Sequence, residues 1–137
     1  MADVTGKWKE GMAFDLILEN YSLPADSDPA FGGKGYGPKP KGLMLTALAG
    51  CTGMDVVSML SKMRVPFESF EININAELAE KHPKVFTKIH IEYVFEGNDL
   101  NLDKIERAID LSLNDYCAVA NTLKHTAEIT HTVTINP

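Results

Sequence analysis

The chain has 137 residues, of which 45% are hydrophobic and 23% charged, and its formal net charge is −6 at pH 7. This length fits a single domain over residues 1–137, with a core large enough for an α+β fold. The negative charge argues against nucleic acid or an anionic membrane as the main partner. Residues 1–11 lack the apolar segment of a signal peptide. We therefore expect a cytoplasmic protein.

The longest apolar stretch, residues 43–54, is shorter than the roughly 20 residues that a membrane-spanning helix needs. No membrane association is therefore predicted.

The N-terminal third predicts a small sheet followed by a long loop. Apolar and polar residues alternate from Met12 to Leu18, as in a half-buried strand, and Val4 to Trp8 is the expected hairpin partner. Residues 20–40 hold four prolines and four glycines, which indicates a long surface loop with room for a short strand. Lys34 lies among the glycines, so the spacing of a phosphate-binding loop is absent and a flexible loop is favoured.

Residues 41–63 predict a helix that is apolar on almost every side, which is typical of a helix buried in a domain or between subunits. A stripe of mostly small side chains follows helical spacing along it: Thr46, Gly50, Gly53 and Val57. Each glycine inside a helix costs about 1 kcal/mol relative to alanine, so the stripe indicates close approach of another backbone, expected to be a second helix. Pro66 prevents the helix from continuing.

The remaining segments complete an α+β pattern. Apolar and polar residues alternate over 70–78 and 85–95, which predicts a long antiparallel hairpin with one solvent-exposed face. In this pattern the side chain of Phe86 points to the opposite face from those of Tyr93 and Phe95. Helical spacing then runs from 102 to 116, with Asn101 as the expected N-cap, and a short helix follows over 117–124. The last strand, 129–135, turns His131 inward, where a hydrogen-bonded core histidine is more expected than a metal ligand.

Two cysteines carry the possible chemistry, although their number alone favours simple buried packing. Cys51 lies mid-helix on the same face as Asp55 and Ser58; burial and an adjacent carboxylate would both disfavour its thiolate, so we expect a reactive thiolate to need a cation from elsewhere. Cys117 begins a helix, where the free N–H groups and the macrodipole favour a thiolate. Spacing alone leaves open whether the two thiols meet.

No metal ligand set or cofactor is predicted from spacing. The histidines lack ligand spacing, and neither cysteine has a close partner in sequence. The four histidines are His82, His90, His125 and His131.

Two segments resemble the OsmC/Ohr family. Residues 37–57 contain a G-P-K-P turn leading into an apolar helix with an A-x-x-x-C-x-x-x-D core, and residues 115–120 with 129–131 are similar to the family's second-cysteine segment and last strand. The resemblance implies antiparallel sheets wrapped around a long buried central helix. It also implies an intertwined homodimer.

The resemblance further implies an antioxidant thiol peroxidase. Cys51 would attack an organic hydroperoxide or hydrogen peroxide and become a sulfenic acid, Cys117 would condense with it to a disulfide, and a dithiol of the lipoyl type or another thiol would reduce that bond. Family members carry a glutamate where this chain has Gly42, and an arginine ahead of the first cysteine. In this chain the arginines are Arg64 and Arg107, and the cationic side chains that precede Cys51 are all lysines.

These departures support an alternative function. The fold would be retained without efficient peroxidase turnover, and the protein would bind a hydrophobic small molecule at the dimer interface.

Overall fold

The computed structural model describes residues 3–137, and its elements follow the predicted order. The chain forms two compact units, one ending at Thr46 and one running from Ala47 to Pro137. Helix α1 (Pro40–Lys62) begins in the first unit and continues through the second, which confirms the helix predicted for 41–63.

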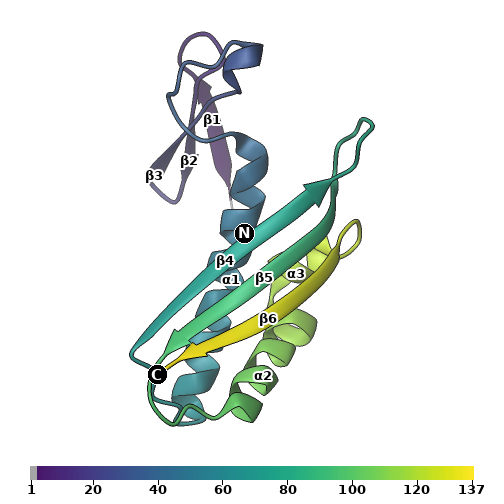
Figure 1. Ribbon diagram of the computed structural model, residues 1–137. Helices are drawn as coiled ribbons and strands as arrows, with labels where there is room; N and C mark the ends of the chain where they lie inside the picture. Colours follow the sequence, from purple (N-terminus) through teal and green to yellow (C-terminus); the bar gives the residue numbers. More distant parts are fainter. Residues whose placement is uncertain (1–2) are drawn as a thin grey trace. The chain divides into compact units, whose positions relative to one another are not determined.

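The first unit holds an antiparallel sheet in the order β1 (Val4–Trp8), β2 (Phe14–Leu18) and β3 (Tyr21–Ala25) (Figure 1). The predicted hairpin is confirmed, and β3 is the short strand that the loop prediction for residues 20–40 allowed; the same segment also holds a 3₁₀ turn, η1 (Pro29–Phe31). Leu18 pairs directly with Tyr21 across Glu19 and Asn20, which both have positive φ. Such a two-residue turn matches the twist of a hairpin, but it lacks the usual Asn-Gly signal.

The glycine-rich segment is organised around Asp26, which is only 3% exposed. Its carboxylate accepts the backbone N–H groups of Ser27, Lys34 and Tyr36 at 2.7, 3.0 and 3.0 Å. A Cβ on Gly33 would lie 1.7 Å from the carbonyl oxygen of Ser27, so only glycine fits there. The N–H groups that a phosphate would need are directed at the protein's own carboxylate, which agrees with the predicted absence of a phosphate loop.

Acid is expected to loosen this segment. The three backbone hydrogen bonds hold the pKa of Asp26 below its usual 3.8. Because the pKa is lower in the folded state, the stabilisation is complete above the unfolded pKa and is lost as the pH falls through the folded one. Amide hydrogen exchange at Lys34 and Tyr36, corrected for intrinsic rates, should show protection falling as the pH is lowered below the usual pKa of 3.8. Asp26→Asn should remove this pH dependence, and equal pH profiles for both proteins would contradict the assignment.

The second unit is built on the sheet β4 (Ser69–Leu78), β5 (Phe86–Glu96) and β6 (Glu128–Asn136). β4 and β5 form the predicted antiparallel hairpin, but β6 runs parallel to β5. The expectation of purely antiparallel sheets is therefore wrong. A parallel pair requires a crossover connection, and the helical segment between β5 and β6 supplies it.

One side-chain orientation in the hairpin differs from the strict alternation. Glu77 pairs with Lys88 and Leu78 with Phe86, so the register shifts by one residue at this point. The shift turns Phe86 to the buried side, where it is 7% exposed, while Val85 is 40% exposed. The prediction that Phe86 points away from Tyr93 and Phe95 is wrong because a β-bulge reverses the alternation.

Helices α1 and α2 (Leu102–Leu111) lie on one face of this sheet (Figure 1). Asn101 caps α2 as predicted, since its side chain accepts the N–H of Lys104 at 3.1 Å. His131 faces the same side as Tyr93, and its Nε2 lies 2.8 Å from Glu106 Oε2, so the predicted hydrogen bond is confirmed; its side chain is 29% exposed, so His131 is not the core residue that was expected. The core between the helices and the sheet contains a set of completely buried apolar side chains: Leu48, Val56, Leu60, Ile91, Phe95, Ile105 and Ile109.

Helix α1 buries only one of its faces within the chain. Its buried residues are Leu48, Thr52, Val56 and Leu60, whereas Met54 is 75% and Val57 43% exposed. The expected all-round burial of a central helix is thus not met by a single chain. By length and composition, α1 is also able to cross a membrane, a test that core helices of soluble proteins pass as well. The helix is longer than the apolar stretch of residues 43–54, from which no membrane-spanning helix was predicted.

Candidate functional site

The fold brings the two cysteines together in the second unit. The Sγ atoms of Cys51 and Cys117 and a carboxylate oxygen of Asp55 all lie within 4.8 Å of one another. Cys51 and Asp55 are one turn apart on α1, and Cys117 precedes the short helix α3 (Ala118–Leu123). Cys51 and Asp55 are half-buried, and Cys117 is completely buried. These three groups are called the thiol–carboxylate cluster.

A π-helical turn positions Cys117. After α2 ends, the backbone forms η2 (Ser112–Tyr116), and Cys117 N donates to the carbonyl of Ser112 at 2.7 Å. Cys117 then has an extended backbone and acts as the N-cap of α3, with its Sγ accepting the N–H of Ala120 at 3.3 Å. Isolated π turns are frequent at functional sites. The predicted helix start at residue 117 is confirmed.

The predicted electrostatics of Cys117 are wrong. Burial is the largest effect and raises the pKa of its thiol to about 11, and the neighbouring Cys51 raises it as well. The N–H of Ala120 acts in the opposite direction but does not overcome the burial. Cys117 is therefore a protonated thiol at neutral pH.

A buried chain of hydroxyl groups holds the carboxylate in place. Ser112 Oγ donates to Asp55 Oδ2 at 2.9 Å, and Thr52 Oγ1 lies 2.8 Å from Ser112 Oγ and 2.8 Å from the hydroxyl of Tyr93. Since the single hydrogen of Ser112 is directed at the carboxylate, Ser112 accepts from Thr52, and Thr52 accepts from Tyr93. Burial raises the pKa of Tyr93 to about 12, so its hydroxyl remains a donor.

This hydroxyl chain joins three elements around the cysteines. Thr52 is on α1, Ser112 on η2 and Tyr93 on β5, and each is completely buried. Sequence patterns identified Asp55 only as a neighbour of Cys51 and did not identify the other three. The available signal was a hydroxyl side chain on the buried face of a helical segment, Thr52 in α1 and Ser112 in η2, because a buried hydroxyl group requires a hydrogen-bond partner.

The family is assigned from a match that includes both cysteine segments. The sequence profile of the OsmC-like protein family matches residues 32–132, a range that contains Cys51, Asp55, Ser112 and Cys117. The chain belongs to the OsmC-like family.

Relatives of this OsmC-like chain agree over nearly its full length. It is 35% identical to Protein YhfA of Escherichia coli K12 over 126 residues, which cover 91% of each chain. A hypothetical protein of Aquifex aeolicus VF5 has a similar structure, with a TM-score of 0.84, 25% identity and coverage of 100% of this chain and 98% of the other. The organic hydroperoxide resistance protein OhrB of Bacillus subtilis shares the fold at a TM-score of 0.66 and 16% identity, with 98% of each chain covered.

Proposed function

We propose that this OsmC-like protein is a thiol peroxidase that reduces organic hydroperoxides or hydrogen peroxide. The observation that carries the proposal is the approach of Cys51 Sγ and Cys117 Sγ, from distant segments of the chain, to within 4.8 Å. A small adjustment brings such a pair to bonding distance. The fold shared with a protein named for organic hydroperoxide resistance supports the same chemistry.

Cys51 is the proposed nucleophile because it is the less buried of the two thiols. Its thiolate attacks the outer oxygen of the peroxide, the O–O bond breaks, and an alcohol leaves after taking up one proton. Sulfur is oxidised to the sulfenic acid and the peroxide is reduced. The proton that the leaving alkoxide takes up is the one lost by the Cys51 thiol, and the nearby Asp55 carboxylate is the proposed carrier of it.

Cys117 is the proposed resolving thiol. Its sulfur attacks the Cys51 sulfenic acid, an S–S bond forms, and hydroxide leaves as water. Because the pKa of Cys117 is raised to about 11, this thiol must lose its proton during the attack, and the nearby Asp55 carboxylate is proposed to accept that proton and pass it to the leaving hydroxide. A dithiol, such as a lipoyl group, then reduces the disulfide in two exchange steps.

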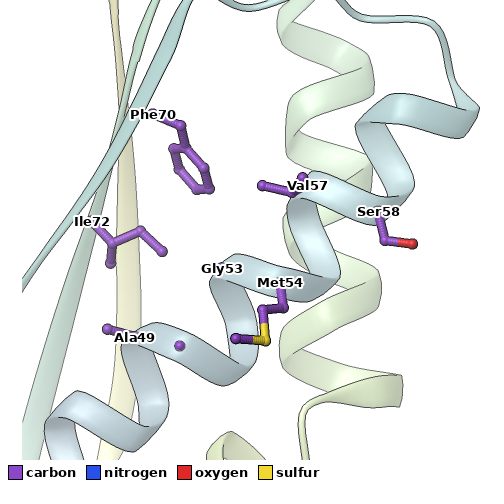
Figure 2. A pocket seen from close by; sticks show the side chains of 8 residues that line it. Ala49, Gly53, Met54, Val57, Ser58, Phe70 and Ile72 are labelled. Carbon is purple, nitrogen blue, oxygen red and sulfur yellow. The ribbon is translucent and has the colours of Figure 1, made fainter.

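The functional unit is a proposed homodimer. An apolar groove of about 610 Å³ lies between α1 and β4, with Ala49 and Val57 facing Phe70 and Ile72 (Figure 2). Gly50 and Gly53 also line it, so the stripe of small residues is at an open surface of the chain. A second copy of α1 packed here would bury the exposed Met54 and explain Gly50, whereas a Cβ on Gly53 would already lie 3.0 Å from Ile72 Cδ1 of β4. We further propose that residues 1–137 act as one OsmC-like domain in the cytoplasm.

Intact mass measurement tests the chemistry. Reduced protein treated with about one equivalent of cumene hydroperoxide and denatured should lose the mass of two hydrogen atoms, about 2 Da, as the disulfide forms. Cys51→Ser should abolish that loss. Unchanged free thiols after excess peroxide would overturn the peroxidase. The binding of a hydrophobic small molecule, which the apolar groove favours, would then be the better proposal.

A further inference from the structure

We infer that the reduced protein binds a divalent cation of the zinc class at the thiol–carboxylate cluster. Within residues 3–137, Cys51, Asp55 and Cys117 are the group whose ligand atoms converge, all within 4.8 Å. Two thiolates and one carboxylate match the ligand preference of Zn²⁺, whereas Mg²⁺ and Ca²⁺ prefer oxygen alone. This inference does not depend on the peroxidase, since it requires only the reduced thiols.

The spacing of the cluster suits a tetrahedral ion. Zn–S bonds of about 2.3 Å and Zn–O bonds of about 2.0–2.2 Å place neighbouring ligand atoms about 3.5–3.8 Å apart. The present spacing of up to 4.8 Å exceeds this by about 1 Å, so rotation of half-buried side chains is sufficient. Three protein ligands leave a fourth position for water, as in open zinc sites.

The surroundings of the cluster already orient the ligands. Ser112 donates to Asp55 Oδ2, and Ser112 is itself fixed through Thr52 and Tyr93. Carboxylates that bind metals are usually held by such a second hydrogen bond. The N–H of Ala120 points at Cys117 Sγ and would stabilise a bound thiolate. These hydrogen bonds orient the side chains of Asp55 and Cys117 in the metal-free protein.

A divalent cation suits the charge of the ionised ligands. Cys117 is a protonated thiol in the metal-free protein, so the cluster carries three negative charges only once an ion has displaced both thiol protons, and a divalent ion then offsets two of those charges. Binding must release the thiol protons, so the ion and the peroxide compete for the same two sulfurs. A loaded protein should therefore resist alkylation of Cys51.

Cobalt titration tests the site directly. The full-length protein, reduced with a phosphine and free of added thiols and chelators, should take up about one Co²⁺ per chain, with tetrahedral d–d bands and thiolate-to-cobalt charge transfer. Zn²⁺ should displace the Co²⁺ and slow iodoacetamide labelling. Absence of the charge-transfer band would overturn the inference.

Variants separate ligands from neighbours. Asp55→Asn keeps an acceptor for Ser112 and should weaken Zn²⁺ binding by about 10- to 100-fold, and Ser112→Ala, which keeps all three ligands, by about tenfold. Glu128→Gln, an exposed carboxylate at the start of β6, should bind like the wild type. Wild-type affinity in both Asp55→Asn and Ser112→Ala would overturn the site. Metal binding without peroxide consumption would contradict only the proposed peroxidase.

Discussion

Replacing Cys51 by serine is expected to lower the rate of organic hydroperoxide reduction by at least about a thousandfold. A serine hydroxyl is almost fully protonated at neutral pH and cannot accept an oxygen atom as sulfur does. The measurement is consumption of cumene hydroperoxide with a lipoyl-type dithiol as reductant. The substitution is nearly isosteric at a half-buried position, so the loss reports chemistry rather than unfolding.

Cys117→Ser provides the matched control for this prediction. A serine at this position can accept the N–H of Ala120 as an ordinary N-cap, so α3 should persist. This variant should still form the Cys51 sulfenic acid, which dimedone traps, but it should form no disulfide. The assignment of roles would be reversed if Cys51→Ser formed a sulfenic acid and Cys117→Ser did not.

Replacing Gly50 by leucine is expected to convert the proposed dimer into a monomer. A Cβ built on Gly50 meets nothing within 4 Å in the single chain, and the residue lines the apolar groove. A monomer should therefore tolerate the larger side chain and gain up to about 1 kcal/mol of helix propensity. A second helix packed on the glycine stripe would instead be displaced by several ångströms.

Light scattering during size-exclusion chromatography measures this effect. The wild type should have about twice the mass of one chain, and the Gly50→Leu variant about the mass of one chain. Gly42→Leu is the matched control, because Gly42 also has open space on α1 and does not line the groove. An unchanged dimer in Gly50→Leu would place the subunit interface on another surface.

Local patterns were sufficient for most of the elements. Alternation of apolar and polar residues predicted β2, β4 and β5, and helical spacing predicted α1. Helical spacing together with the N-cap Asn101 predicted α2. β3 was foreseen only as a short strand without bounds inside a loop, because its turn uses Glu19 and Asn20 rather than glycine. The direction of β6 was missed because strand pairing across a long crossover has no short-range signal.

The candidate site was predictable only in part. Both cysteines were identified, but the high pKa of Cys117 depends on burial by residues distant in sequence. The order of the hydroxyl chain from Tyr93 to Asp55 likewise depends on three elements meeting. A sequence pattern shows which side chains need partners, and only the fold shows which partners they obtain.

The parallel pairing of β6 has a consequence for the order of folding. β4 and β5 are joined by a short turn and can pair through local contacts, whereas β6 can pair with β5 only after the connecting segment has closed a long loop. Cys117 lies within that connecting segment. We therefore expect the two thiols to come together late in folding, when the segment that connects β5 and β6 packs on the sheet. In chains that have not yet reached this stage, the two cysteines remain apart.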